Sequence, residues 1–418
     1  MSGPRAAMPT WHPLLWLPPV LLSCVPFPTA NAAAGSIPAS GTRPACATPK
    51  AAPKASPEAM LPTKHPAPRS GWRQWTPKDA DAWVAPETVP PRSGPASAPA
   101  PETAVAPPPA EWASAEFRIM ATTATVRLPA ANANEIESVV DIFTKVDDLA
   151  NEWRPGTPLH AINAGAGREP VAAPAELLAL LAKGLRLAET THGRFDPSWA
   201  ALWGLWDFKR PVVPDPQAAA LRAASVDFRQ ILVDPEAGTV SLPDPAMRLG
   251  LGGLAKGHAL DLAAARLVDA GVQDFLLTAG GQVLAHGAAG DRPWRVGVRD
   301  PRGSPADHFG WLPATDASVS TSGDYEHFFE VDGIRYHHIL DLCTGMPAAG
   351  VRSATVRAPD ATTADALSTA LVALGVEHGM GLVAQMDDVD AVMVDDAGSV
   401  FITDSLLPEF RMVHPPAP

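Results

Sequence analysis

Residues 249–261 read Leu-Gly-Leu-Gly-Gly-Leu-Ala-Lys-Gly-His-Ala-Leu-Asp, an order of residue types that indicates a turn followed at once by a helix. Gly252 and Gly253 would let the backbone approach a bound group closely, because glycine has no Cβ. The first amides of a helix have no partner within the helix and attract anions, and Lys256 adds a positive charge there. The stretch matches neither a phosphate-binding loop nor a dinucleotide-binding fingerprint, so a tight junction with a surface lysine is the alternative to an anion site.

The composition favours a large folded domain with an acidic surface. The chain has 418 residues, of which 46% are hydrophobic, and its formal net charge is −13. This share of apolar residues is enough for a full core, and the negative charge argues against a nucleic-acid partner. The three cysteines, Cys24, Cys46 and Cys343, have no zinc-ligand spacing and do not indicate a disulfide framework.

Residues 1–34 resemble an export signal. Their apolar stretch, 11–28, is interrupted by prolines and is too short for a good membrane-spanning helix. Small residues over 29–34 provide cleavage sites. Residues 21–24 read Leu-Leu-Ser-Cys, which resembles a bacterial lipoprotein signal with Cys24 as the lipidated residue. We therefore expect an exported, periplasmic protein. If Cys24 is lipidated, the protein would in addition be anchored to the inner membrane.

Residues 35–112 are rich in Pro, Ala, Ser and Thr and poor in branched apolar side chains. Such a segment buries too little surface to offset the entropy lost on ordering, so we expect a disordered arm. Its tryptophans, among them Trp72, are interpreted as apolar points on this arm, with docking onto the domain as the alternative. A single folded domain is expected over 113–418.

Within this domain, some segments have the hydrophobic period of a helix and others have the alternation of a strand. Four segments with one apolar face each are predicted helices: 135–152, 174–190, 258–270 and 363–374. Short alternating runs joined by turns such as Asp332-Gly333 are predicted hairpins. Strands outnumber helices and occur mostly in hairpins, so the sequence predicts one α+β domain with a mostly antiparallel mixed sheet and packed helices.

Two further segments carry predictions that bear on a site. Residues 116–128 alternate well enough to be one strand, with Met120 near its middle. Trp199, Trp203 and Trp206 recur at helical spacing, which predicts a buried stripe on one helix.

Three other stretches carry groups suited to chemistry at an anion. Residues 320–325 read Ser-Thr-Ser-Gly-Asp-Tyr, whose hydroxyls could hold polar oxygens or merely satisfy a turn. His337 and His338 are neighbours in a predicted strand, so only one of them faces a given site, where it could act as acid or base. Asp365 and Thr369 share one helical face, and their oxygens suit a hard cation such as Mg²⁺, with helix capping as the alternative.

Together these stretches resemble the ApbE family, the FAD:protein FMN transferases, over residues 115–412. The matching blocks stand in family order: Met120–Thr122, Trp153–Pro155, Gly193–Pro197, Leu251–Asp261, Ala279–Gly281, Thr321–Tyr325, His338–Gly345 and Ala364–Thr369. Any one block is weak, whereas eight in order are strong. The resemblance implies a single ApbE-like domain.

The resemblance also implies a reaction. The family uses Mg²⁺, breaks the pyrophosphate of FAD, attaches FMN to a threonine hydroxyl of an acceptor flavoprotein, and releases AMP. A membrane redox subunit would be one such acceptor. Helix amides, Lys256 and Mg²⁺ would together neutralise the phosphate charge, which is the main requirement of phosphoryl-type transfer.

Particular residues are implied as well. The metal ligands would be Asp365, Thr369 and the carbonyl of Gly253, and His338 would assist deprotonation of the acceptor hydroxyl. The positions that would contact FAD are Met120, Trp153, Arg194, Phe195, Asp196, Lys256 and Ile339.

The chain departs from the family pattern at a few positions. Gly250 and Gln282 stand where the family has aspartates, Thr278 replaces an asparagine, and Leu342-Cys343 replaces Pro-Arg. These changes concern FAD affinity more than metal binding. Two alternatives to transfer therefore stay open. One is an Mg²⁺-dependent FAD pyrophosphatase that gives FMN and AMP, and the other is an exported FAD-binding protein without catalysis.

Overall fold

A nine-stranded sheet organises the part of the chain that this computed structural model describes, residues 71–82 and 111–417. In spatial order the strands are β1 (Trp72–Gln74), β18 (Val400–Thr403), β17 (Asp390–Asp395), β16 (Val351–Ala358), β11 (Ala317–Gly323), β8 (Gln282–His286), β7 (Phe275–Ala279), β3 (Thr122–Pro129) and β2 (Trp112–Ile119). Every neighbouring pair is antiparallel. The predicted α+β domain with a mostly antiparallel sheet is therefore confirmed.

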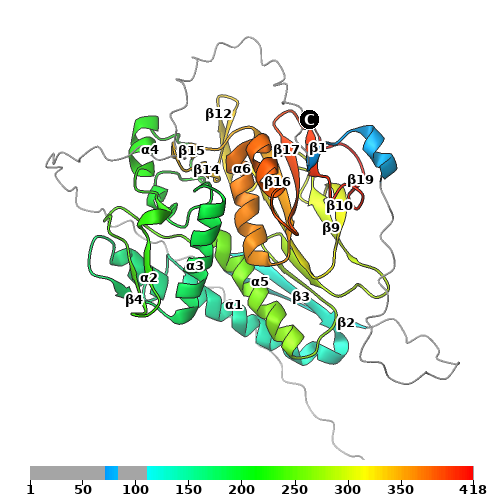
Figure 1. Cartoon of the computed structure of the whole chain (residues 1–418), viewed down its shortest axis with the longest axis horizontal. Helices are drawn as coiled ribbons and strands as arrows, with labels where there is room; N and C mark the ends of the chain where they lie inside the picture. The colour runs from blue at the N-terminus through cyan, green and yellow to red at the C-terminus, as the bar shows by residue number, and fades with distance from the viewer. Residues whose placement is uncertain (1–70, 83–110, 418) are drawn as a thin grey trace, which may run out of the picture. The chain divides into compact units, whose positions relative to one another are not determined.

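The long helices gather on one face of this sheet (Figure 1). There α5 (Gly252–Asp269) and α6 (Ala361–Val383) pack against each other, and α1 (Ile136–Ala150) packs beside α5. α3 (Ala175–Thr190) contacts both α5 and α6. The shorter helices α2 (Pro158–Ala164) and α4 (Pro216–Ala223) lie in the segment between α1 and α5.

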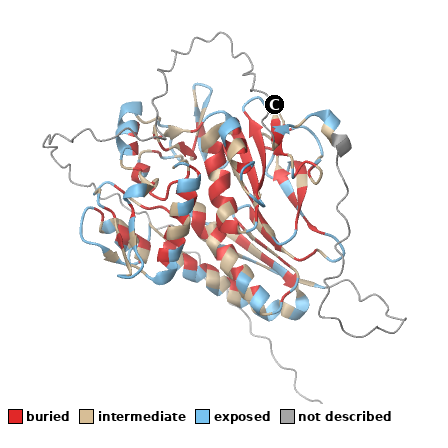
Figure 2. Ribbon diagram, in the orientation of Figure 1, coloured by how far each residue is buried: buried red, intermediate tan, exposed pale blue. Residues whose placement is uncertain are grey.

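A second sheet covers the opposite face near β16, β17 and β18. It contains β9 (Trp294–Arg299), β10 (His308–Ala314) and β19 (Arg411–Met412). Because successive side chains of a strand point to opposite faces, Ala391 and Met393 of β17 pack with α6, whereas Val392 and Val394 pack with the second sheet. Figure 2 shows the result, in which burial is concentrated in α5, α6 and the strands behind them.

The remaining strands form small sheets at the periphery. They are the hairpin β12 (Phe328–Val331) and β13 (Ile334–His337), the pair β14 (Leu340–Asp341) and β15 (Met346–Pro347), and the group β4 (Val171–Ala172), β6 (Thr239–Ser241) and β5 (Leu232–Asp234).

Residues 71–82 correct the prediction of a disordered arm over 35–112. β1 pairs with β18, and a 3-10 helix follows at Pro77–Ala82. Trp72 is 5% exposed, and its ring meets that of Phe401 edge to face with centroids 6.0 Å apart. Composition could not reveal this strand, because its partner lies near the other end of the chain. The export signal and the rest of the predicted arm lie outside the described residues.

Met120 lies at a turn and not, as the alternation over 116–128 predicted, within one strand. β2 and β3 are a hairpin, and the turn residues Met120 and Ala121 have φ angles of 51° and 58°. A tight turn with two positive φ angles usually takes glycine or asparagine, so this sequence carries no turn signal. Such a conformation costs about 1–3 kcal/mol for each non-glycine residue and often occurs at functional sites.

The three tryptophans predicted to form a stripe do not share a helix. Only a 3-10 turn occurs there, at Ala200–Leu202, and Gly204 with a φ of 78° follows it. Trp206 is buried and its Nε1 donates to the carbonyl of Gly345 at 2.8 Å. Trp203 is 57% exposed, so the helical spacing of these residues does not report a common buried face.

The helix predicted over 363–374 is the first part of α6, which continues beyond a kink at Gly375. By length and composition α6 is the one described helix that could cross a membrane. Its burial between α5 and the sheet explains that composition without a membrane, because a helix that is covered on most sides is apolar on most sides.

α5 and α6 approach each other most closely at Gly257. A Cβ there would lie 2.4 Å from the carbonyl oxygen of Ala361 and 2.6 Å from the Cα of Thr362. Both atoms belong to the backbone and cannot rotate away. We predict that Gly257→Ala lowers the free energy of unfolding by about 3 kcal/mol, as for severe overpacking, measured by urea denaturation.

Gly381→Ala is the matched control for this substitution. Gly381 also lies inside a helix, α6, but nothing stands within 4 Å of its Cβ position. The change should leave stability unaltered or raise it by up to about 1 kcal/mol, the helix preference of alanine over glycine. Equal unfolding midpoints for the two variants would contradict the close approach.

Candidate active site

One end of the nine-stranded sheet brings several predicted site residues together. The hairpin turn at 120–121 lies there beside the turn that joins β7 to β8, because the Gly280 amide donates to the carbonyl of Thr123 at 3.1 Å. A Cβ at Gly280 would lie 3.4 Å from Cδ of Lys256. The side chain of Lys256 therefore passes over this end of the sheet.

Lys256 and Asp365 form an ion pair at the centre of the site. The Nζ of Lys256 lies 3.0 Å from Oδ2 of Asp365 and also donates to the carbonyl of Gly252 at 2.7 Å. The side chains are 24% and 7% exposed, respectively. A carboxylate that is this well buried needs a compensating charge, and Lys256 in the second turn of α5 supplies it to Asp365 of α6.

Thr369 lies one turn after Asp365 on the same face of α6, as the spacing predicts. Its Oγ1 donates to the carbonyl of Asp365 at 3.2 Å and lies 3.3 Å from Oγ of Ser322 on β11. A Cβ at Gly253 would lie 4.0 Å from this Oγ1 and 3.2 Å from Cε2 of Phe195. The absence of a side chain at Gly253 thus leaves room between α5 and the hydroxyl of Thr369.

This corner has the chemistry of a hard-cation site. Among the described residues no three or more His, Cys, Asp and Glu side chains are grouped to hold a metal. Mg²⁺ needs few protein ligands when phosphates and water complete its shell, and the carboxylate of Asp365 and the hydroxyl of Thr369 are suitable oxygens. The Gly253 carbonyl, in the second residue of α5, is directed along the helix and keeps one lone pair for a metal.

The N-terminus of α5 is open, whereas that of α6 is capped. Leu251, which precedes α5, makes no side-chain hydrogen bond to the helix. Two carboxylates cap the N-terminus of α6. Asp360 accepts from the amide of Thr363 at 2.8 Å, and Asp261 accepts from the amide of Ala361 at 2.6 Å. The Leu254 amide donates to the carbonyl of Leu251 at 2.9 Å, so the amides available to an anion are those of Gly252 and Gly253, and Lys256 adds its charge beside them.

Two residues of the loop between α3 and the 3-10 turn are engaged within the protein. Arg194 donates from Nη1 to Oδ1 of Asp341 at 2.9 Å. The carboxylate of Asp196 is buried and accepts from the amides of Ser198 at 2.8 Å and Phe228 at 2.9 Å. Asp196 therefore holds the loop together, and Arg194 links the loop to the β14–β15 pair.

Cys343 follows Asp341 closely and is disulfide-bonded. The other cysteines of the chain, Cys24 and Cys46, lie outside the described residues. The cysteine spacing did not indicate a disulfide framework, and the bond at Cys343 corrects that interpretation. Spacing along the chain could not reveal the bond, because a disulfide requires only that two Cα atoms come close in space.

His338 lies just beyond β13. Its amide donates to the carbonyl of His327 at 3.0 Å, and its Nδ1 is buried without a hydrogen-bond partner among the described residues. Burial lowers the pKa of His338 to about 4, and the neighbouring Lys256, His327 and His337 act in the same direction. The imidazole is therefore neutral at neutral pH and able to accept a proton.

His337 has different surroundings from its neighbour. It is 4% exposed, and its Nε2 lies 2.9 Å from the carbonyl oxygen of Ala348. Burial also lowers the pKa of His337, so this ring is a neutral member of the interior. Adjacent positions at the end of a strand thus give the two histidines different surroundings.

The other residues implied by the resemblance are more dispersed. Ile339 is 4% exposed and packs in the core with Ala364 and Leu367 of α6, so its side chain is not free for a ligand. Trp153 is 46% exposed in the loop after α1 and lies against Trp203, with ring centroids 3.9 Å apart. Helical spacing placed Trp203 in the core, and nothing in the sequence predicted this exposed aromatic pair.

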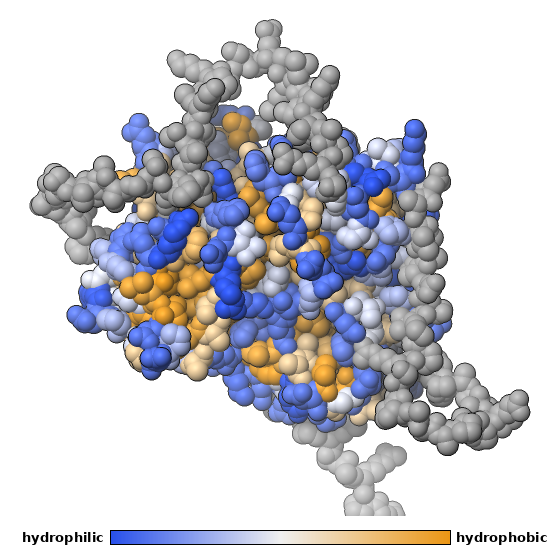
Figure 3. Space-filling view, viewed as in Figure 1, coloured by the Kyte–Doolittle hydropathy of each residue, from blue (hydrophilic) through white to orange (hydrophobic). Residues whose placement is uncertain are grey.

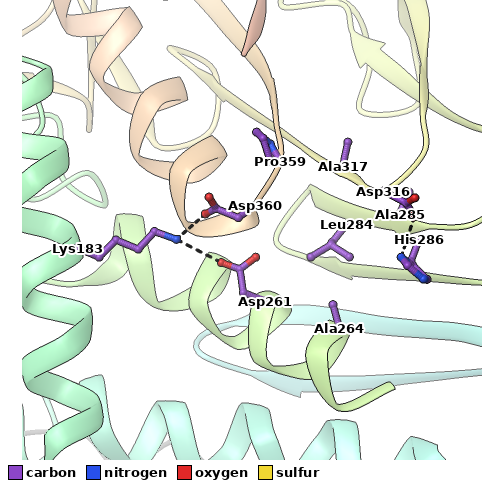
Figure 4. Close-up of a pocket in the computed structure, with 10 residues that line it drawn as sticks. All are labelled: Lys183, Asp261, Ala264, Leu284, Ala285, His286, Asp316, Ala317, Pro359 and Asp360. Atoms are coloured by element: carbon purple, nitrogen blue, oxygen red, sulfur yellow. Dashed lines mark hydrogen bonds and ion pairs between the residues drawn. The ribbon is translucent and has the colours of Figure 1, made fainter. Parts of the chain in front are cut away.

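A pocket of about 380 Å³ lies outside this cluster (Figure 4). On one side, Lys183 of α3 pairs with Asp360 at 2.6 Å and with Asp261 at 3.8 Å, and across it His286 Nδ1 lies 2.7 Å from Asp316 Oδ1. Figure 3 shows hydrophilic surface where α3, α5 and α6 meet. None of the implied site residues lines this pocket, and its carboxylates serve the start of α6 and the ion pairs around it.

Comparison with known proteins identifies the family. The chain matches the model described as "ApbE family" over residues 120–393. It is 37% identical over 308 residues to the FAD:protein FMN transferase of Treponema pallidum, a match that covers 68% of this chain and 84% of that protein. The protein of the same name from Rhodobacter capsulatus is 35% identical over 320 residues, which cover 72% of this chain and 58% of that protein.

Structural comparison agrees. The crystal structure of the ApbE protein from Thermotoga maritima has a TM-score of 0.66 and 29% sequence identity, and the match covers 71% of this chain and 98% of that one. The chain therefore belongs to the ApbE family.

The ion pair at the centre of the site should be important for stability. Lys256→Met would leave the carboxylate of Asp365 nearly buried and without its charge partner. We predict that the free energy of unfolding of the metal-free protein falls by about 2 kcal/mol, less than for a fully buried pair because Lys256 is partly exposed. Urea denaturation in the presence of a chelator measures this change.

Lys183→Met is the matched control, because Lys183 pairs with Asp360 where both side chains are more exposed, at 30% and 39%. Its cost should be below about 1 kcal/mol. The double variant Lys256→Met/Asp365→Leu should recover most of the stability lost by the single change. An equal cost at the two lysines would show that Asp365 does not depend on Lys256.

Proposed function

We propose that this protein transfers FMN from FAD to a threonine hydroxyl of an acceptor flavoprotein, with the help of Mg²⁺, and releases AMP. The observation that carries the proposal is the convergence of Lys256, Asp365 and Thr369 beside the uncapped start of α5. Relatives named FAD:protein FMN transferases support the same reaction.

The reaction forms one bond and breaks another at the same phosphorus. The threonine Oγ attacks the phosphorus on the FMN side of the pyrophosphate, and the bond from that phosphorus to the bridging oxygen breaks. AMP leaves with the bridging oxygen, and the hydroxyl proton goes to a base. Negative charge on the phosphate oxygens is the main obstacle, so groups that neutralise it provide most of the catalysis.

The residues of this chain would divide that task. The first amides of α5 and the ammonium of Lys256 would bind the pyrophosphate oxygens. Asp365, Thr369 and the Gly253 carbonyl would hold Mg²⁺, which when bound supplies further neutralisation of phosphate charge. Binding of the metal would compete with Lys256 for the Asp365 carboxylate and so release the ammonium toward the phosphates.

His338 is the group best suited to accept the hydroxyl proton. A base must be unprotonated before the reaction, and burial keeps the pKa of His338 near 4. Asp324 is a poorer choice, because Arg302 binds both its oxygens at 2.7 Å.

We also propose that the chain is exported, with an N-terminal signal over 1–34 and with lipidation of Cys24 as a means of anchoring it to the inner membrane. The disulfide at Cys343 supports an oxidising compartment, since disulfides persist mainly outside the cytosol. Mass spectrometry of the mature N-terminus tests the proposal. A mature chain that retains residues 1–20 would contradict it.

Purified protein, FAD, Mg²⁺ and an acceptor protein test the reaction. Transfer predicts equal amounts of AMP, measured by chromatography, and of covalent FMN on the acceptor, measured by mass spectrometry. AMP without the adduct would identify a pyrophosphatase. FAD binding with neither product would identify a binding protein.

Asp365→Asn tests the metal site with little change in shape. The loss of one formal charge should reduce AMP release at least about 10²-fold, because the cation would lose its only carboxylate. Calorimetric titration with Mg²⁺ in the presence of FAD should lose its signal. Glu377→Gln, an exposed change farther along α6, should alter neither measurement. Unchanged Mg²⁺ dependence in Asp365→Asn would exclude this metal site.

His338→Ala separates chemistry from binding. Transfer should slow by roughly 10²–10⁴-fold, the usual contribution of a general base, while the FAD dissociation constant shifts far less. His337→Ala should instead reduce stability, because it removes a buried ring and its bond to Ala348, and leave the rate per folded molecule near wild type. The opposite pattern would assign the base to His337.

A further inference from the structure

We propose that His327 is a positioning residue for His338, and that its ring covers the imidazole of His338 and keeps it in the neutral, proton-accepting form. The inference rests on the proposed function, because it assigns His338 the role of base. It concerns a residue that neither the sequence motifs nor the resemblance singled out.

The β12–β13 hairpin brings the two histidines together. His327 immediately precedes β12 and His338 immediately follows β13, and Phe328 pairs with His337 across the hairpin. The His338 amide donates to the His327 carbonyl at 3.0 Å. The rings meet edge to face, with centroids 5.3 Å apart and planes at 81°. The two histidines are thus linked both by a backbone hydrogen bond and by the contact between their rings.

Among the described residues, Nδ1 of His338 lacks the hydrogen-bonded partner that orients a typical catalytic base. A carboxylate or carbonyl usually binds the second ring nitrogen and fixes the tautomer. Here Nδ1 of His338 is buried, and no described group bonds to it. Asp324, a buried carboxylate that influences the pKa of the adjacent His337, is bound by Arg302 and lies 3.5 Å from Nη1 of Arg335. Within the part of the chain that the structure describes, the ring of His327 is an aromatic contact that can hold the imidazole in place.

The surroundings of His338 favour its neutral form on balance. Beyond burial, the pKa of His338 is lowered by His327, by His337 of β13 and by Lys256 of α5, and only the backbone hydrogen bond with His327 opposes them. His327 acts in two ways, because its ring shields one side of His338 from water and its charge, when protonated, repels a second proton. His327 is exposed, so it forms the outer wall of the pair.

Two substitutions separate these effects. His327→Phe keeps an aromatic ring but removes the titratable nitrogens, whereas His327→Ala removes the ring as well. His378→Ala, at an exposed histidine of α6, is the control. For each variant the transfer rate is measured against pH, and the pKa of His338 is measured by NMR titration of its Cε1 proton, which does not require activity.

The expected results follow from the sign of each effect. Both variants should raise the pKa of His338, His327→Ala more than His327→Phe, and the acidic limb of the rate profile should move to higher pH in the same order. At pH 8 His338 is neutral in wild type and in both variants, so a slower rate there reports lost positioning. His327→Ala should be about tenfold slower than wild type, and His327→Phe, which keeps the ring, should stay within about threefold. FAD affinity should not change.

Other outcomes would overturn the proposal. A merely structural role for His327 would lower the rate equally at all pH values and leave the NMR titration of His338 unmoved. An unaltered pKa in both variants would equally exclude it. Failure of the proposed reaction can be told apart from failure of this inference. In the first case the wild-type protein would form no covalent FMN, whereas the NMR titration would still report whether His327 affects the pKa of His338.

Discussion

The close contact between α5 and α6 is the constraint on which the rest of the structure depends. Gly257 permits it, because any side chain there would meet the backbone of α6. Asp261, one turn further along α5, accepts hydrogen bonds from the first amides of α6. These bonds fix where along α5 the helix α6 begins. With the helices in this register, Lys256 reaches Asp365 and Gly253 faces Thr369. A shift of one residue in either helix would separate these groups.

The same contact explains why one helix start is open to an anion and its neighbour is not. α6 begins under Asp360 and Asp261, and an anion would be repelled there. α5 begins at Gly252 without a side-chain cap, next to a lysine. The pocket lined by Lys183 and His286 belongs to the capped side, where the charges are already paired. Its size alone would have suggested a site, but its charges serve the fold.

Much of the domain could be predicted from the sequence, because many of its elements are decided locally. The apolar face of α1, the Asp332-Gly333 turn and the one-turn spacing of Asp365 and Thr369 are such cases. The sequence could not show contacts that depend on distant residues or rare backbone angles. β1 pairs with a strand near the C-terminus, the turn at 120–121 has positive φ without glycine, and Trp203 is exposed despite its helical spacing. His327 carries no signal in the sequence, because only the hairpin register places it against His338.

The positions at which the chain departs from the family pattern are accommodated within the fold. A Cβ at Gly250 would lie 2.7 Å from Nε1 of Trp199, and that nitrogen donates to the carbonyl of Gly250 at 2.9 Å. The indole thus occupies the space that an aspartate side chain at this position would need. Gln282 donates from Nε2 to the carbonyl of Ala361 at 2.6 Å, where a carboxylate could only accept. Both changes alter the contacts that support α5 and α6. They leave the pair of Lys256 and Asp365 intact, so the charges beside the uncapped start of α5 persist although neighbouring contacts have changed.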